Sequence, residues 1–122
     1  MPKMILIVDD EKLLTKTLSN ALKEAGYKTA TATTAETAEK QIFSDKDFDL
    51  VLLDNKLVKK SGLAIVKKMR DRDIKAKVIL MTAYDSPEVR SEAKKLKVNR
   101  YVKKPFDLPS MLDTVKEVIE RN

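Results

Sequence analysis

The segment from Met4 to Glu11, MILIVDDE, decides the fold, because an apolar run of strand length stops abruptly at two acids. Amphipathic segments separate this run from four others of strand length, near residues 27–32, 50–53, 77–81 and 99–102. This alternation is typical of repeated βα units. Most runs contain almost only Ile, Leu, Val and Met, as expected when helices cover both faces of a parallel sheet. We predict an α/β fold, a three-layer doubly wound (βα)5 sandwich with five parallel strands.

The segments between the strands differ in how firmly their apolar faces anchor them. The helix over residues 11–25 is well bounded, because Gly26 can adopt the left-handed conformation that ends a helix. Asp107 is the expected N-cap of the last helix, with Pro109 in its first turn. The helix over residues 86–97 should be loosely held, because its apolar face consists only of Val89, Ala93 and Leu96.

Composition excludes several classes of function. The chain has 122 residues, of which 43% are hydrophobic, so we expect one domain over residues 1–122. The sequence contains neither Cys nor His, which excludes disulfides, thiolate chemistry and imidazole bases. No segment has the length and apolarity of a membrane span, and no signal peptide is evident, so we expect a cytoplasmic protein without membrane association. The formal net charge of +6 is spread over helical segments that also carry acids, so we expect no direct nucleic-acid binding.

Three acids are expected to converge at the carboxyl edge of the sheet, where open α/β folds bind ligands. Asp9 and Asp10 follow the first apolar run, and Asp54 follows the third. Carboxylates that lie this close repel one another unless protons or a cation compensate their charge. The oxygen donors suit Mg²⁺ (or Mn²⁺), with a backbone carbonyl just after Asp54 as a further ligand.

A carboxylate beside a metal ion can also act as a nucleophile and form an aspartyl-phosphate. Two other residues at strand ends suit such a site. Thr82 offers a hydroxyl donor, and Lys104 offers an ammonium for a phosphoryl oxygen. Pro105 permits a cis peptide bond that would turn Lys104 inward. Each residue alone has an ordinary interpretation, and Asp10 in particular is a possible N-cap for the following helix.

The sequence resembles the receiver domain of two-component response regulators, the CheY-like family, over essentially its whole length. Five motifs carry the resemblance in the expected order and spacing: Ile5-Leu6-Ile7-Val8-Asp9-Asp10-Glu11, Leu50-Val51-Leu52-Leu53-Asp54, Ser61-Gly62, Met81-Thr82-Ala83-Tyr84 and Lys103-Lys104-Pro105-Phe106. The resemblance implies the strand order 2-1-3-4-5. It also implies a signalling switch of a two-component system or phosphorelay that is controlled by phosphorylation and is not an enzyme.

The resemblance assigns a role to the three aspartates, which we call the acidic cluster, and to Thr82 and Lys104. Asp54 is the implied phosphoacceptor, which takes a phosphoryl group from a histidine of a sensor kinase or a phosphotransfer protein. Asp9 and Asp10 are the implied metal ligands, together with Asp54 and the backbone carbonyl of Lys56. Thr82 and Lys104 would bind the phosphoryl oxygens.

The resemblance also implies how phosphorylation of Asp54 would change the surface of the protein. Tyr101 matches an aromatic residue whose side chain moves inward when Thr82 engages the phosphoryl group. The surface formed by residues 86–97, 99–102 and 107–119 would contact a downstream output protein or mediate a weak dimer of an otherwise monomeric chain. Lys56 and Tyr84 occupy positions that vary in the family and tune the phosphoryl lifetime, so we expect a fairly long-lived phosphoryl group.

Two segments depart from the family pattern. Val58 stands where proline is usual, and Lys59 and Lys60 follow where small or apolar residues are common. We expect both lysines to face solvent rather than an acidic partner. Lys97 occupies a position where a glycine commonly ends the fourth helix, and we expect Asn99 to adopt the left-handed conformation instead.

Three alternatives to a simple switch remain open. The first is a phosphorelay intermediate, like the sporulation-type regulators that pass phosphate to a second histidine protein. The second is a metal-dependent phosphatase of the haloacid dehalogenase kind, which needs an acid two residues after its nucleophile. Lys56 stands there after Asp54, so only a version with Asp9 as the nucleophile keeps an acid, Glu11. The third is a pseudo-receiver that binds partners without phosphorylation.

Overall fold

The computed structural model describes residues 2–121, in which five strands and five helices alternate along the chain. The elements are β1 (Met4–Val8), α1 (Lys12–Glu24), β2 (Lys28–Ala32), α2 (Ala35–Ile42), β3 (Leu50–Asp54), α3 (Gly62–Asp71), β4 (Lys77–Thr82), α4 (Pro87–Lys95), β5 (Arg100–Lys103) and α5 (Leu108–Glu120). All neighbouring strands are parallel, and their order is β2-β1-β3-β4-β5. The predicted fold class and strand order are therefore confirmed.

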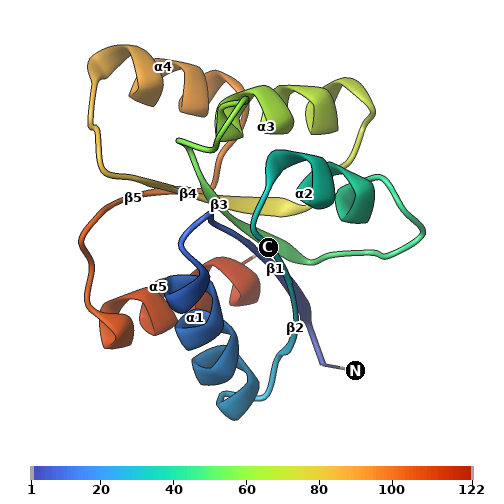
Figure 1. Cartoon of the computed structure of the whole chain (residues 1–122), viewed down its shortest axis with the longest axis vertical. Coiled ribbons are helices and arrows are strands. Elements are labelled where there is room, and N and C mark those ends of the chain that lie inside the picture. The colour runs from blue at the N-terminus through green and yellow to red at the C-terminus, as the bar shows by residue number, and fades with distance from the viewer. Residues whose placement is uncertain (1, 122) are drawn as a thin grey trace.

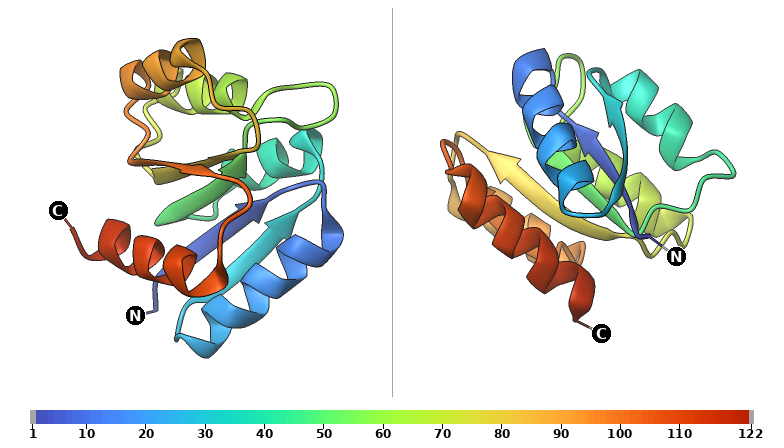
Figure 2. Two further views of the ribbon diagram at one scale, coloured as in Figure 1. Left: turned by 90° about the vertical axis from the view of Figure 1, so that its left-hand side faces the viewer. Right: turned by 90° about the horizontal axis from the view of Figure 1, so that it is seen from below.

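The sheet lies between two layers of helices (Figure 1). Helices α1 and α5 cover one face, and α2, α3 and α4 cover the other, as the two further views in Figure 2 also show. Strand β2 is an edge strand, and its residues are more exposed than those of β1 and β3.

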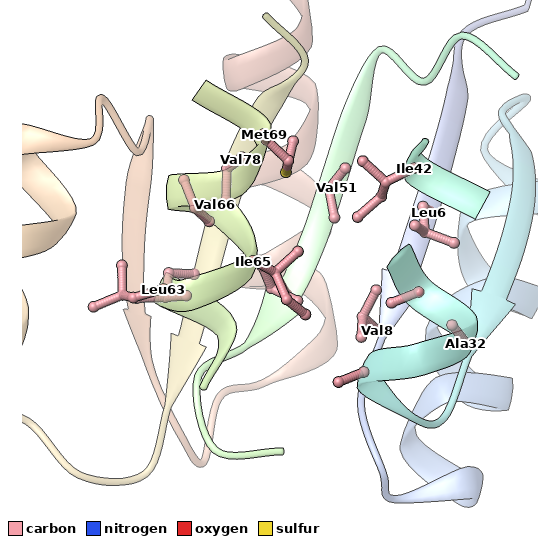
Figure 3. Close-up of a cluster of buried hydrophobic side chains, with 14 of the residues drawn as sticks. Leu6, Val8, Ala32, Ile42, Val51, Leu63, Ile65, Val66, Met69 and Val78 are labelled. Atoms are coloured by element: carbon pink, nitrogen blue, oxygen red, sulfur yellow. The ribbon is translucent and has the colours of Figure 1, made fainter. Parts of the chain in front are cut away.

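Successive residues of the inner strands point into two separate cores. Leu6, Val51 and Val78 belong to the core beneath α2 and α3, part of which is drawn in Figure 3. Their neighbours Ile5 and Ile79 belong to the core beneath α1 and α5. These strands are nearly continuous apolar runs because both of their faces are buried.

The predicted helix boundaries are confirmed at two positions and wrong at one. Gly26 has a φ of 99° after α1, and the Asp107 carboxylate accepts a hydrogen bond from the Ser110 amide at the start of α5. After α4, however, the left-handed residue is Lys97, with a φ of 59°, and not Asn99. Asn99 instead pairs with Val78 of β4, because its amide donates to the Val78 carbonyl and its side-chain oxygen accepts from the Val78 amide, both at 2.9 Å.

Helix α4 is the most weakly anchored helix of the described chain. Ala93 is its only buried residue, whereas Val89 only packs partly against the core. The expectation of a loosely held helix is consistent with this small buried face. Among residues 2–121, no helix has both the length and the apolar character needed to cross a membrane.

Candidate functional site

The predicted site residues meet at the carboxyl edge of the sheet. Asp9 and Asp10 follow β1, Asp54 ends β3, Thr82 ends β4, and Lys104 follows β5. Carboxylate oxygens of the three aspartates all lie within 4.8 Å of one another. Asp9 and Asp54 are buried, whereas Asp10 is exposed at the rim.

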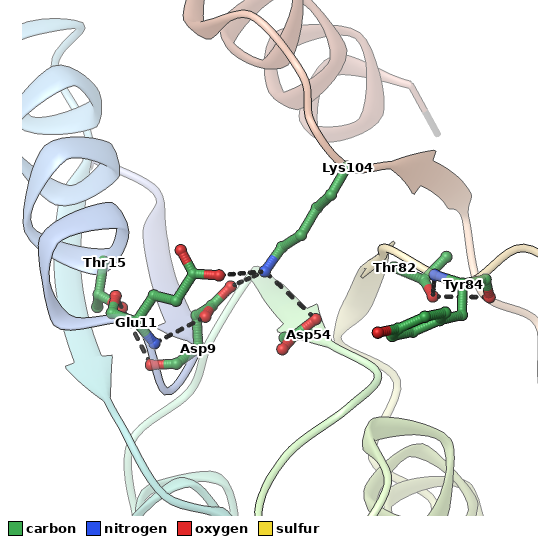
Figure 4. Close-up of polar contacts among 7 residues, drawn as sticks. All are labelled: Asp9, Glu11, Thr15, Asp54, Thr82, Tyr84 and Lys104. Atoms are coloured by element: carbon green, nitrogen blue, oxygen red, sulfur yellow. Dashed lines mark hydrogen bonds and ion pairs between the residues drawn. The ribbon is translucent and has the colours of Figure 1, made fainter.

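Lys104 bridges the two buried acids (Figure 4). Its Nζ lies 2.6 Å from Asp9 Oδ2, 3.5 Å from Asp54 Oδ1 and 3.8 Å from Glu11 Oε1. Burial lowers the pKa of the ammonium, but the hydrogen bond to Asp9 and the charge of Asp54 more than offset this, and the pKa lies above its ordinary value. The Lys104–Pro105 peptide bond is cis, as the sequence permits.

Asp54 is held in an unfavourable electrostatic environment. Burial and the neighbouring charge of Asp9 raise the pKa of its carboxyl group to about 6, and Lys104 only partly opposes them. The protein therefore excludes water from Asp54 and places a second carboxylate beside it. A divalent cation would relieve the repulsion, and a purely oxygen donor set without His or Cys fits Mg²⁺.

The turn after β1 orients Asp9 and corrects the interpretation of Asp10 as an N-cap. Asp9 Oδ1 accepts a hydrogen bond from the Glu11 amide at 2.9 Å, and the Thr15 hydroxyl donates to the Asp9 carbonyl at 3.1 Å. The N-cap of α1 is Glu11, whose side chain forms no capping hydrogen bond and whose amide binds Asp9. Asp10 is therefore not the N-cap, and its carboxylate lies in the acidic cluster instead.

The loop after β3 is closed tightly against the strand. The Asn55 carbonyl accepts a hydrogen bond from the Gly62 amide at 2.8 Å, and its side-chain oxygen accepts one from the Leu63 amide at 3.1 Å. A Cβ at Gly62 would lie only 2.5 Å from the Asp54 carbonyl oxygen, so this position has no room for a side chain. The loop therefore begins and ends next to Asp54, with Lys56 paired to Ser61 across it.

The expectation that Lys59 and Lys60 both face solvent is wrong for Lys60. Its Nζ lies 2.8 Å from Glu39 Oε2 on α2, and Lys68 on α3 binds the other oxygen of Glu39 at 3.1 Å. The hydrogen bond from Lys60 is the main cause that lowers the pKa of Glu39. Lys59 is exposed and has a positive φ of 76°.

Thr82 is engaged within its own turn. Its Oγ1 donates to the Tyr84 carbonyl at 3.0 Å and accepts from the Tyr84 amide at 3.1 Å. The Lys56 ammonium lies above the exposed Tyr84 ring, 4.7 Å from the ring centroid. The two residues expected to tune phosphoryl lifetime thus contact each other beside Thr82.

The Tyr101 side chain contacts Asp85 of the β4–α4 loop. Its hydroxyl donates to Asp85 Oδ1 at 3.1 Å. The same carboxylate binds Arg90 of α4 through two bonds of 2.6 and 2.8 Å and lies 3.3 Å from the Lys103 Nζ of β5. The hydrogen bond from Arg90 is the main cause that lowers the pKa of Asp85. Asp85 therefore connects the β4–α4 loop, α4 and β5.

Comparison with known proteins identifies the family. A model of the response regulator receiver domain matches residues 5–116. The chain belongs to the response regulator receiver family. Among solved structures, a CheY-like receiver domain protein from Methanospirillum hungatei superposes on this receiver with a TM-score of 0.92 at 28% identity, covering 98% of this chain and 95% of that one. The non-phosphorylated HemR receiver domain of Leptospira biflexa gives a TM-score of 0.91 at 27% identity and covers 98% of this chain and 96% of that one.

Curated relatives differ in how much of their length the receiver matches. Sporulation initiation phosphotransferase F of Bacillus subtilis is 34% identical over 119 residues, which cover 98% of this chain and 95% of that protein. The regulatory protein AtoC of Escherichia coli is 39% identical over 107 residues, which cover 88% of this chain but only 23% of AtoC. The transcriptional regulator PhoP of B. subtilis is 31% identical, and the receiver spans 50% of its length.

The structure brings Asp9, Asp10, Asp54 and Lys104 together, and it adds contacts that the sequence did not predict. Glu11 contributes a third acid beside Lys104, and its spacing of two residues from Asp9 was the available signal. Glu39 and Asp85 carried no comparable signal, because their partners lie on other elements.

Proposed function

We propose that this receiver is a signalling switch in which Asp54 accepts a phosphoryl group. The single observation that carries the proposal is a buried carboxylate at the end of β3, with Lys104 and two further aspartates around it. We further propose that residues 1–122 form one receiver domain, which acts as a phosphoacceptor rather than as an enzyme that turns over a free substrate.

The proposed transfer is an in-line displacement at phosphorus. A carboxylate oxygen of Asp54 forms the new O–P bond as the N–P bond of a donor phosphohistidine breaks, and the departing imidazole nitrogen keeps the bonding pair. A nucleophilic carboxylate must be ionised, and the Lys104 ammonium beside Asp54 favours the ionised form. When bound, Mg²⁺ supplies the positive charge that offsets the carboxylates and the incoming phosphoryl group.

The metal ligands of this proposal are the carboxylates of Asp9, Asp10 and Asp54, with the backbone carbonyl of Lys56. Asp9 is oriented by the turn after β1, where its carboxylate accepts a hydrogen bond from the Glu11 amide. Mg²⁺ usually keeps several waters and takes only one or two carboxylates. Exposed Asp10 is the member of the set best placed to act through such a water.

The proposed readout begins at Thr82 and Lys104. To grip a phosphoryl oxygen, the Thr82 hydroxyl must give up its hydrogen bond to the Tyr84 carbonyl. That change loosens the β4–α4 loop, which also holds Asp85 and, through it, Tyr101. An inward movement of Tyr101 then alters the surface of α4, β5 and α5 that contacts an output protein or a second receiver. Because α4 buries only a small face, a shift of this helix should cost little free energy.

Acetyl phosphate with Mg²⁺ tests the proposal, read by intact mass. We expect one phosphoryl adduct in the wild type and in Asp113→Asn, an exposed control on α5, and none in Asp54→Asn. Rapid hydrolysis of varied phosphomonoesters would indicate a phosphatase instead. The absence of an adduct with acetyl phosphate and with a phosphorylated histidine donor would indicate a pseudo-receiver.

A phosphorelay role is the more specific form of this proposal. It is supported by the similarity to a protein named as a phosphotransferase over 95% of that protein's length. The test is to incubate the isolated phosphorylated receiver with a histidine phosphotransfer protein. Return of the phosphoryl group to histidine faster than its hydrolysis would support a relay, whereas slower transfer would favour a terminal switch.

A further inference from the structure

Basic residues occur along the whole chain, but the excess of basic over acidic residues falls in one segment. Residues 67–100 contain eleven Lys and Arg against five Asp and Glu, an excess of six that equals the formal net charge of the whole chain. The rest of the sequence is therefore electrically balanced. A local excess of positive charge attracts oppositely charged molecules.

Much of this excess surrounds one groove. The groove has a volume of about 550 Å³ and lies between the ends of α3 and α4 and the start of β4. Its five cationic side chains face a single acid, Asp73, and they are Arg70, Lys75, Lys77, Lys95 and Lys97. Lys77 opens β4, whereas Thr82 closes it, so the groove lies at the end of the sheet opposite to the acidic cluster.

The cations of the groove have no carboxylate partners among residues 2–121. Arg70 donates to the carbonyls of Ile74, Ala76, Leu96 and Lys97, and Lys77 Nζ donates to the carbonyls of Val118 and Arg121. Carbonyls satisfy the hydrogen bonds but leave the positive charges uncompensated. The other three lysines are exposed and form no ion pair in the described chain.

We propose that this groove docks an acidic segment of a partner protein. Flexible lysine side chains can meet carboxylates at variable spacing, and several uncompensated charges in one concave surface attract an oppositely charged chain. The proposal is independent of phosphorylation at Asp54, because the two sites lie at opposite ends of the sheet.

Other polyanions fit the groove less well. Its lining contains no aromatic side chain on which the bases of a single strand could stack. The fork of Arg70 is already bound to carbonyls and is not free for bidentate contacts to phosphates or bases. The large exposed hydrophobic residues of the described chain, Leu13, Val58 and Tyr84, lie outside it, so no apolar anchor for a membrane surface accompanies the charge.

Fluorescence anisotropy with a labelled octaglutamate peptide tests the proposal. We expect saturable binding at about 50 mM NaCl that weakens strongly at about 200 mM. The triple variant Lys75→Gln, Lys95→Gln and Lys97→Gln should bind about tenfold more weakly. A triple variant with Arg at the same positions should retain binding, which separates loss of charge from loss of folding.

The matched control removes three exposed lysines elsewhere, by Lys16→Gln, Lys23→Gln and Lys28→Gln. It should bind the peptide as the wild type does, and the groove variant should still form the phosphoryl adduct at Asp54. Equal losses in the two Gln variants would overturn the proposal, because net charge alone would then explain binding. No binding at low salt would also overturn it, as would tighter groove-dependent binding of an oligothymidylate of the same length.

Discussion

At the scale of single residues, Asp54 destabilises the folded chain in the absence of a cation. Its carboxyl group has a pKa near its ordinary value of 3.8 when unfolded and about 6 when folded. A raised folded pKa contributes stability below pH 3.8 that is lost as the pH rises through 6. The Asp54 carboxylate is thus ionised at neutral pH at a cost to the free energy of unfolding, as is common at functional sites.

Asp54→Asn should therefore stabilise the metal-free protein near pH 7.5 by on the order of 2 kcal/mol. This gain should shrink as the pH falls from 7 to 4, because the wild-type carboxyl group becomes protonated. Urea unfolding across this pH range, without Mg²⁺, measures the difference. Parallel pH profiles for the two proteins would contradict the raised pKa.

We expect Lys104, also a single residue, to act as an internal counter-ion that competes with a bound metal ion. Its ammonium lies 2.6 Å from Asp9 Oδ2, an oxygen of the acidic cluster. Lys104→Gln should therefore raise Mg²⁺ affinity, by about tenfold, because one positive charge leaves the pocket. Lys103→Gln is the matched control, since Lys103 pairs with Asp85 outside the pocket. Titration followed by NMR measures both affinities, and unchanged or weaker binding in Lys104→Gln would refute the competition.

At the scale of elements, two ion-pair clusters hold segments that flank the pocket. Lys60 ties the loop after Asp54 to Glu39 of α2. Lys60→Gln should weaken Mg²⁺ binding about twofold to fivefold and speed amide exchange at Gly62, because this loop carries the Lys56 carbonyl. Lys68→Gln removes the second partner of Glu39, which lies on α3 and not on the loop, so it should leave both measurements unchanged.

We expect Asp85 to attach helix α4 to β5. Only Ala93 is buried, and the bidentate contact of Arg90 with Asp85 joins the helix to β5. Asp85→Asn should accelerate hydrogen exchange in α4 several-fold while leaving α3 unchanged. Asp71→Asn, which breaks the exposed Lys67 pair on α3, is the control and should not affect α4. Equal exchange in α4 of Asp85→Asn and the wild type would show that Asp85 does not hold the helix.

At the scale of the whole molecule, a ligand that binds only the folded state should stabilise it by mass action. Mg²⁺ at about a hundred times its Kd should raise the melting temperature by about 10 °C for a domain of this size. Scanning calorimetry with and without MgCl₂ measures the shift, with NaCl of equal ionic strength as the control. A comparable shift in NaCl would indicate general screening rather than binding at the acidic cluster.

Most of the fold and the members of the acidic cluster could be predicted from the order of residues alone. Apolar runs of strand length alternate with amphipathic segments, and this pattern requires covered parallel strands whose carboxyl ends converge. Asp9, Asp54 and Lys104 follow such runs, so their proximity was a consequence of topology. Gly26 was also predictable, because its conformation depends mainly on neighbouring residues.

The tertiary structure alone decided which charged side chains pair. Lys60 binds Glu39 across 21 positions of sequence, and Tyr101 binds Asp85 across 16. It also gave Lys97 rather than Asn99 the left-handed conformation, because Asn99 forms hydrogen bonds with Val78 of the neighbouring strand. Hydrophobic burial follows a periodic pattern that a sequence displays directly, whereas the partners of long polar side chains depend on how separate elements pack. The order of residues therefore determined the sheet and its acidic edge, and packing determined the contacts that surround them.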